Sequence, residues 1–181
     1  MIQQLDVSIL LWIQENLRFE VLTPVMRAVT FLGDNGWFWI ALGIALLCFR
    51  RTRPVGFTVL IALAIGALIT NVGLKNLVGR MRPYDYTEAI HRLLPVQTDY
   101  SFPSGHTCAS FAAAIVCFRM LPRKYGIAAL ILAGLIAFSR MYLGVHFPTD
   151  ILGGLVAAAV SAWLANRLYP WIVQKLRKRL M

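Results

Sequence analysis

Three short segments of the chain combine cations, histidines and a carboxylate near expected helix ends. The first is Lys75-Asn-Leu-Val-Gly-Arg80-Met-Arg82-Pro83, in which Lys75 and Arg82 are seven positions apart. Seven residues make nearly two helical turns, so both cations share a face if the helix continues, whereas Arg80 points elsewhere. Pro83 disfavours helical geometry at Arg82 and leaves its guanidinium free to turn. Taken alone, such cations are more often interfacial side chains that reach toward water.

The second segment, Pro103-Ser104-Gly105-His106, lies where a helix is expected to begin. Ser104 is a good N-cap, and the free backbone N–H groups of a helix N-terminus bind anions. Gly105 lets the backbone approach a ligand closely. Pro-Ser-Gly is equally typical of a plain helix start, but His106 at the same place favours a site with chemistry.

The third segment runs from Ser139 to Asp150 and contains Arg140 and His146. Arg140 ends one expected helix, Asp150 lies in the first turn of the next, and His146 lies between them. A carboxylate four residues away can fix the tautomer of an imidazole and raise its basicity. A lone loop histidine is more often structural. The case for catalysis therefore rests on all three segments meeting on one side of the protein.

The elements that position these segments are expected to be membrane helices. Hydrophobic residues make up 59% of the chain, charged residues only 14%, and the mean hydropathy is +0.66. A soluble domain carries about a quarter charged residues, and the uncharged stretch 54–74 is long enough to cross a bilayer. We predict an all-α, polytopic membrane helix bundle of five to six spans, with helices at 36–50, 54–79, 104–120, 124–142 and 148–169.

The chain is expected to form one domain with two flanking segments. Residues 1–35 are predicted to form one or two amphipathic or partly spanning helices, since 6–17 has an apolar face at helical spacing. Residues 36–170 form the membrane-embedded core, and 171–181 a basic tail. The one long loop, 83–103, contains a possible short helix at 87–94.

The charges indicate which side of the membrane each turn faces. The turns at 50–53 and 119–124, the last helix end and the C-terminal tail carry eleven cations and no carboxylate. Lys and Arg near helix ends stay cytoplasmic, so we expect a cytoplasmic C-terminus and an outward-facing long loop. The net charge of +10 is thus explained by orientation rather than by nucleic acid. The tail is expected to touch anionic lipids.

The three segments resemble the type-2 phosphatidic acid phosphatase family, whose pattern is KxxxxxxRP, PSGH and SRxxxxxHxxxD. All three match in the family's order, and the resemblance covers roughly residues 36–170. It implies a core like that of the acid phosphatases and vanadium haloperoxidases. The haloperoxidases themselves are soluble, so the apolar spans argue against their activity here.

The resemblance also implies the role of each residue. Lys75, Arg82 and Arg140 hold the phosphoryl oxygens, and Ser104 and Gly105 add hydrogen bonds at the helix start. In the catalytic group, His146 attacks phosphorus, Asp150 orients it, and His106 protonates the leaving oxygen before activating water. No metal ion or cofactor is expected. Because His146 must be neutral while His106 is protonated, turnover is expected to have a bell-shaped pH profile.

The expected activity is hydrolysis of a lipid phosphate drawn from the bilayer, by a multi-pass protein of a bacterial plasma membrane with its active site outside. Undecaprenyl diphosphate, which is recycled for cell-wall synthesis, is the favoured substrate on the basis of the family. Phosphatidylglycerophosphate and phosphatidic acid are the alternatives. A lipid phosphotransferase and a non-catalytic lipid-binding protein remain as other classes, although the second leaves the two histidines and Asp150 without a purpose.

Overall fold

The structure is a computed structural model that describes the backbone of residues 1–180 and the side chains of residues 1–171 and 174. Every regular element in this part of the chain is helical, which confirms the predicted all-α class. The elements in chain order are α1 (Ile2–Leu17), α2 (Leu22–Phe31), the 3-10 turn η1 (Asp34–Gly36), α3 (Trp37–Leu47), α4 (Arg53–Ala67), the π-helical segment η2 (Leu68–Leu74), α5 (Lys75–Val78), α6 (Pro83–Tyr86), α7 (Gly105–Met120), α8 (Arg123–Tyr142) and α9 (Pro148–Leu180).

Among the described residues, three helical stretches are long and apolar enough to cross a membrane: Arg53–Tyr86, Arg123–Tyr142 and Pro148–Trp171. A fourth crossing results if α2 and the helix from Asp34 to Leu47, which meet at 43°, form one broken span. The structure therefore supports a bundle that crosses the membrane three or four times, fewer than the five to six crossings predicted. Two predicted spans fall short of this length on their own, namely α7, with 16 residues, and α3, with 11.

Helix α7 lies at the centre of the bundle and packs against α4, α8 and α9. The consecutive α7 residues Ala112, Ala113 and Ala114 point to different sides of the helix, and α9 contributes Ala158 and Ala162; all five are buried completely. Small side chains let membrane helices approach closely, and van der Waals contact then holds them together. The centre of the fold is therefore a tightly packed frame to which the site residues are attached.

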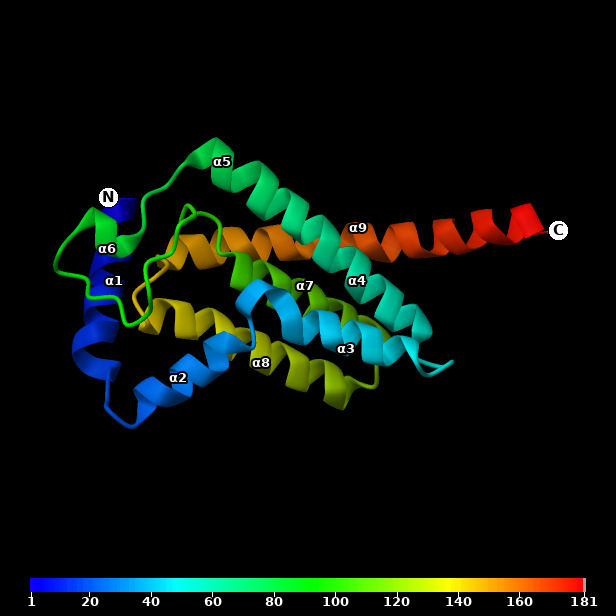
Figure 1. Cartoon of the computed structure of the whole chain (residues 1–181), viewed down its shortest axis with the longest axis horizontal. Coiled ribbons are helices and arrows are strands. Elements are labelled where there is room, and N and C mark those ends of the chain that lie inside the picture. Colours follow the sequence, from blue (N-terminus) through cyan, green and yellow to red (C-terminus); the bar gives the residue numbers. More distant parts are fainter. Residues whose placement is uncertain (181) are drawn as a thin grey trace.

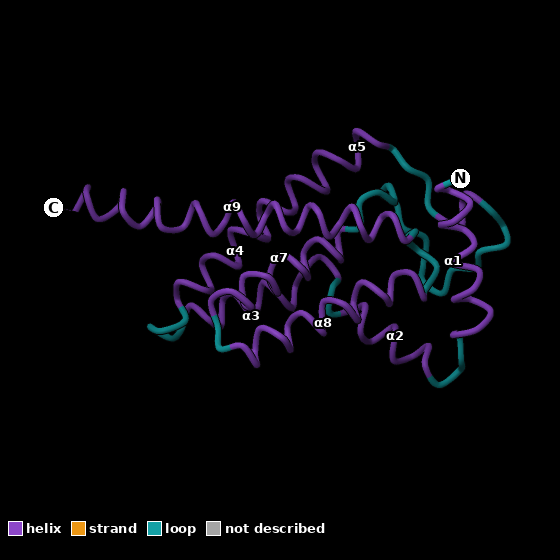
Figure 2. The backbone as a smooth tube through the Cα atoms, turned by 180° about the vertical axis from the view of Figure 1, so that it is seen from behind, coloured by secondary structure: helices purple, strands orange, loops and turns teal. Residues whose placement is uncertain are grey.

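The ends of the bundle differ in character (Figures 1 and 2). The N-terminus, α1, α6 and the long loop lie at one end, whereas the α3–α4 turn, the α7–α8 turn and the C-terminal end of α9 lie at the other. The basic turns thus share one end, as the charge pattern predicts. The tail cations Lys175, Arg177, Lys178 and Arg179 lie outside the described side chains.

Helix α1 runs across the end of the bundle instead of along it (Figure 1). Its residues Leu10 and Ile13, both on the predicted apolar face, are buried. Leu10 packs in a cluster with Ile90 of the long loop and Phe147, the residue after His146. Helix α1 therefore covers the loops that carry the site.

Two local predictions are corrected. The predicted helix 54–79 contains a π-helical segment, and it ends because Gly79 adopts a left-handed conformation with φ of 59°. The helix predicted at 87–94 is absent, and the only regular element of that loop is α6, with Pro83 in its first turn. The backbone at His91 instead accepts a hydrogen bond from Arg18 and donates one to Gln14, both in the α1 segment.

Two glycines of α8 provide a matched test of the α7–α8 packing. A Cβ at Gly126 would lie 2.4 Å from the Cα of Phe118 on α7, whereas a Cβ at Gly134 would have no neighbour within 4 Å. We expect Gly126→Ala to lower the free energy of unfolding by about 1–3 kcal/mol, because the two helices must separate. Gly134→Ala should leave it unchanged or raise it slightly. Thermal unfolding in detergent measures both, and equal midpoints for the two variants would contradict this packing.

Candidate active site

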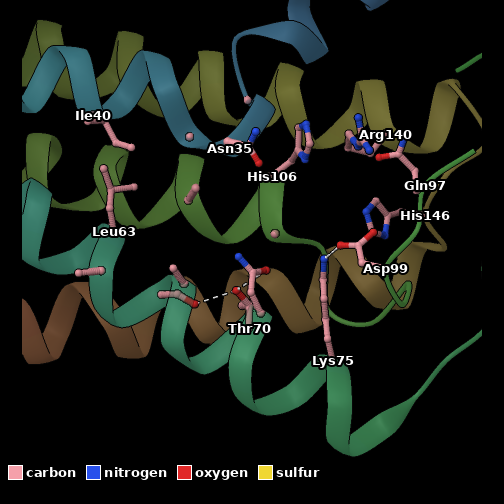
Figure 3. A pocket seen from close by; sticks show the side chains of 18 of the residues that line it. Asn35, Ile40, Leu63, Thr70, Lys75, Gln97, Asp99, His106, Arg140 and His146 are labelled. Atoms are coloured by element: carbon pink, nitrogen blue, oxygen red, sulfur yellow. Dashed lines mark hydrogen bonds and ion pairs between the residues drawn. The ribbon is translucent and has the colours of Figure 1, made fainter. Parts of the chain in front are cut away.

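A cavity of about 520 Å³ opens between α3, α4, α7 and the long loop. One end of it is charged and the other is apolar, as Figure 3 shows for Lys75, Asp99, His106, Arg140 and His146 against Ile40 and Leu63. The structure thus brings together six of the eight predicted site residues, namely Lys75, Arg82, Gly105, His106, Arg140 and His146. An apolar wall that leads to a charged end suits a ligand with a lipid chain and an anionic head.

Lys75 and Arg82 reach the cavity by a route that the sequence did not predict. The π-helical segment directly before Lys75 shifts the helical register, and such segments occur frequently at functional sites. The helix then ends at Gly79, and Arg82 is extended, with φ of −78° and ψ of 157°. The two cations do not share a continuous helix face, yet both side chains converge on the carboxylate of Asp99.

Asp99 is a site residue that the sequence analysis did not single out. Its carboxylate forms ion pairs with Lys75 and with Arg82, the latter at 2.5 Å, and Arg82 Nε also donates to the Asp99 backbone oxygen at 3.0 Å. Burial raises the pKa of Asp99, but the contacts with Lys75 and Arg82 outweigh this and lower it to about 2. An ionised carboxylate therefore neutralises two cations that are themselves almost completely buried.

His146 lies in the loop between α8 and α9 and is buried to 1% exposure. Its Nε2 is 3.3 Å from Nη1 of Arg82, and its Nδ1 is 3.4 Å from Oδ2 of Asp150. The latter distance is long for a hydrogen bond, but Asp150 still faces Nδ1 and favours the proton there. Burial lowers the pKa of His146 to about 3, opposed by Asp150 and reinforced by Arg82 and Arg140. His146 is therefore neutral near pH 7, with an Nε2 lone pair directed toward Arg82.

Asp150 is held in place by more groups than the motif indicates. Ser101 Oγ donates to its Oδ2 at 2.5 Å, and the backbone N–H of Phe147 donates to the same oxygen at 2.8 Å. Arg80 Nη1 donates to Oδ1 at 2.6 Å. Ser101 had no place in the sequence analysis, because a serine three residues before Ser104 carries no signal of its own.

Arg80, which was predicted to point away from Lys75, is the centre of a separate network. It bridges Asp150 and the buried Asp6 of α1, 2.7 Å from the latter, and lies over the ring of Phe147. Asp6 also accepts from the backbone N–H of Thr149 at 3.0 Å. Arg80 therefore connects α1 to the start of α9 and is committed to two carboxylates instead of the cavity.

Arg140 ends α8 and is 2% exposed. Its Nη1 donates to Thr30 of α2 at 2.8 Å. Within the described residues its Nε is the one buried side-chain nitrogen or oxygen without a hydrogen-bond partner. A buried cation with an unused donor at a cavity wall is suited to bind an anion.

The start of α7 contributes its backbone and His106. Ser104 Oγ accepts from Thr107 N at 3.4 Å and from Thr107 Oγ1 at 3.0 Å, so it caps the helix as predicted. Ser104 does not line the cavity, and direct contact of its hydroxyl with a ligand stays a prediction. A Cβ on Gly105 would lie 3.3 Å from Oδ1 of Asn71, so glycine keeps this approach open. His106 Nε2 lies 2.8 Å from Oδ1 of Asp34 in the turn before α3.

The arrangement supports nucleophilic chemistry on an anion. Three cations and a helix N-terminus surround a position that a neutral imidazole, His146, can attack, while a second imidazole, His106, lies opposite. Among the described residues, no three His, Cys, Asp or Glu side chains are grouped so that they could hold a metal ion.

Comparison with known proteins agrees with this chemistry. The chain matches the PAP2 superfamily over residues 55–174. It is 32% identical over 154 residues to an undecaprenyl-diphosphatase of Sulfolobus acidocaldarius, a match that covers 84% of this chain and 74% of that protein. Phosphatidylglycerophosphatase B of Bacillus subtilis is 34% identical over 146 residues, covering 74% of this chain and 68% of the relative.

A solved structure shares the fold. The crystal structure of a transmembrane PAP2-type phosphatidylglycerolphosphate phosphatase from Bacillus subtilis aligns with a TM-score of 0.76 and 28% identity. The alignment covers 94% of this chain and 87% of that one. The likeness therefore includes the N-terminal helices as well as the segment that carries the three motifs.

The Arg80 network predicts a large effect on stability. Arg80→Met would leave Asp6 and Asp150 buried without their shared cation, so we expect a loss of about 3 kcal/mol or more in the free energy of unfolding. Adding Asp6→Asn should recover part of the loss, because it removes one of the two stranded charges. Arg27→Met, at an exposed position of α2, should change the value by less than about 0.5 kcal/mol. Unfolding midpoints in detergent that are equal for Arg80→Met and Arg27→Met would refute the bridging role.

Proposed function

Because the chain belongs to the PAP2 superfamily, we propose that it hydrolyses undecaprenyl diphosphate to undecaprenyl phosphate through a phosphohistidine formed on His146. Membership makes the chain a multi-pass membrane lipid phosphatase that works without a metal ion. The proposal of this substrate and of His146 as nucleophile rests on the cavity, in which a neutral, buried histidine and three cations at one end meet an apolar wall at the other. The similarity to the undecaprenyl-diphosphatase of Sulfolobus acidocaldarius supports the choice of substrate.

Binding begins with an exchange of anions. The terminal phosphoryl group takes the place of the Asp99 carboxylate on Lys75 and Arg82, and the unused Nε of Arg140 supplies a further donor. The backbone N–H groups at the start of α7 add hydrogen bonds. These donors act in a desolvated cavity, where they neutralise the charge of the transition state more effectively than in water.

The first chemical step transfers the phosphoryl group to His146. The lone pair of Nε2 forms a bond to phosphorus while the bond from phosphorus to the bridging oxygen breaks, and the leaving oxygen keeps the electron pair. His106 donates a proton to that oxygen. Asp150, which faces Nδ1 of His146, stabilises the positive charge that the phosphorylated imidazole acquires.

The second step returns the site to its starting state. His106, now neutral, removes a proton from water, and the water oxygen bonds to phosphorus as the bond to His146 Nε2 breaks. Inorganic phosphate leaves, and Asp99 can bind Lys75 and Arg82 again. With an alcohol in place of water the same site would be a phosphotransferase, so phosphate release without an added acceptor separates the two reactions.

We also propose a topology. In it, the end of the bundle with the basic turns and the C-terminus faces the cytoplasm, and the cavity opens on the outer face; the tendency of Lys and Arg near helix ends to stay cytoplasmic supports this orientation. In this arrangement α7 and the broken α2–α3 helix add crossings to the three long spans, giving five, and α1 in the 1–35 segment lies at the outer interface. Residues 36–170 form the embedded core, and 171–181 contact anionic lipid.

The substrate and the nucleophile are tested together by phosphate release. With undecaprenyl diphosphate, phosphatidylglycerophosphate, phosphatidic acid and lysophosphatidic acid, we expect the highest kcat/KM for the diphosphate. His146→Ala should lower turnover by about a thousandfold or more with little loss of lipid binding. His91→Ala, an exposed histidine of the long loop, is the control and should retain full activity. Unchanged turnover in His146→Ala would rule out the nucleophile, and a better rate on phosphatidylglycerophosphate would reassign only the headgroup.

The anion exchange at Asp99 predicts opposite effects on affinity and stability. In the unaltered protein the Asp99 carboxylate competes with every anion that binds Lys75 and Arg82, and it weakens the binding of each by the same factor. Asp99→Asn removes this competitor, so KM and the inhibition constant of inorganic phosphate should both fall about tenfold. The midpoint of unfolding without ligand should fall, since the buried cations Lys75 and Arg82 lose their counter-charge. Asp85→Asn removes an exposed charge from neighbouring α6 and should change neither. An unaltered inhibition constant for phosphate in Asp99→Asn would contradict the exchange.

A further inference from the structure

The contact between Asp34 and His106 joins the N-terminal segment to the chemistry. Asp34 Oδ1 lies 2.8 Å from His106 Nε2. The imidazole side chain is 16% exposed and the carboxylate side chain 47%. The superfamily match begins at residue 55, so Asp34 precedes the segment that carries the motifs. None of the roles proposed above uses this carboxylate.

The backbone around Asp34 is shaped to fit the imidazole ring. A Cβ on Gly33 would lie 2.7 Å from Cδ2 of His106, so only glycine lets this turn approach the ring. Asn35 and Gly36 then adopt positive φ values of 50° and 68°, which turn the chain into α3. Gly36 adopts this conformation readily, whereas at Asn35 it carries a conformational cost that the surrounding structure must sustain. Gly33 before Asp34, and Asn35 and Gly36 after it, therefore shape the turn so that Asp34 lies against the imidazole ring of His106.

The charges around His106 make this carboxylate necessary. Burial above all, and then Arg140 from α8 and Lys75 from α5, disfavour a positive charge on the ring, whereas Asp34 favours it. From α9, the carboxylate of Asp150 is bound to other partners. Helix α3 contributes no titratable side chain, and the one in α4, Arg53, begins that helix at the opposite end of the bundle. Asp34 therefore supplies the negative charge that faces His106 directly.

We propose that Asp34 is a positioning residue for the reaction, which holds His106 by Nε2 and stabilises its protonated form so that Nδ1 can donate to the leaving oxygen. The proton on Nε2 stays between the two side chains throughout, while the Nδ1 proton passes to the leaving group. In the second step Nδ1 accepts a proton from water and the imidazolium forms again beside Asp34. The role rests on the function proposed above for His106, and it makes the N-terminal segment part of the active site.

The direct test is the pH dependence of kcat for Asp34→Asn in the full chain. The substrate is the lipid of the phosphate-release panel that the unaltered protein hydrolyses fastest. His106 must be protonated to act as the acid, so kcat falls as pH rises past the point at which it loses the proton. Without the carboxylate this alkaline fall should move to lower pH by about one unit or more. At pH 8 we expect kcat to drop about 10- to 100-fold with KM changed less than about threefold.

Matched variants separate positioning from a general loss of structure. Asp34→Glu keeps the carboxylate and should restore the alkaline limb toward its original position. Gly33→Ala inserts a methyl group against the ring and should shift the limb in the same direction as Asp34→Asn, which keeps the proposal testable if that variant does not fold. Asp85→Asn is the control for surface charge and should leave the profile unchanged.

Two outcomes would overturn the proposal. One is an Asp34→Asn profile of unchanged shape with a uniform loss of rate. The other is a shift of equal size in Asp85→Asn, which would assign the effect to the general field of the surface. A different preferred lipid in the panel would overturn the proposed substrate while leaving this test intact. Retained turnover in His146→Ala would remove the nucleophile, and the Asp34 profile would still report on the acid.

Discussion

Lys75, Arg82 and Arg140 bring three positive charges into one end of a helix bundle where each side chain is less than a tenth exposed. Burial of a charge is costly unless an opposite charge and hydrogen bonds compensate for it. Asp99 compensates two of the cations, and Thr30 accepts from the third, whose Nε remains without a partner within the described residues. The long loop folds back over the bundle, where its carboxylate meets these two cations. In the proposed mechanism the phosphoryl group of the substrate meets the same demand for negative charge.

A fourth cation shows how partners decide the role of a charge. Arg80 lies within the same motif as Lys75 and Arg82, but it is neutralised by Asp6 and Asp150 and is therefore structural. Its contacts connect α1 to the first turn of α9, where Asp150 faces His146. The two kinds of cation differ in whether their anion can leave: Asp99 is half-exposed on a loop, whereas Asp6 and Asp150 are buried on helices.

The sequence predicted the parts of the site that depend on local spacing. Helix positions follow from apolar runs and prolines, and the motifs identify the residues that line the charged end of the cavity. The partners of these residues come from far along the chain: Asp34 is 72 positions from His106, and Asp6 is 74 from Arg80. A lone carboxylate has no periodicity that would reveal such a partner. The π-helical segment before Lys75 and the loop at 87–94 depend likewise on tertiary contacts, the latter with Gln14 and Arg18 of the α1 segment.

In the proposed mechanism the two histidines need opposite charge states, and the N-terminal segment contacts His106 and the residue next to His146. His146 must be neutral, and burial lowers its pKa to about 3. The next residue, Phe147, packs in one cluster with Leu10 of α1. His106 must carry a proton beside two cations, and the carboxylate opposite it comes from the turn between α2 and α3. A bundle that contained only the three motif segments would lack the contact between Leu10 and Phe147 and would leave His106 without its counter-charge, so the proposed mechanism depends on residues outside the motifs.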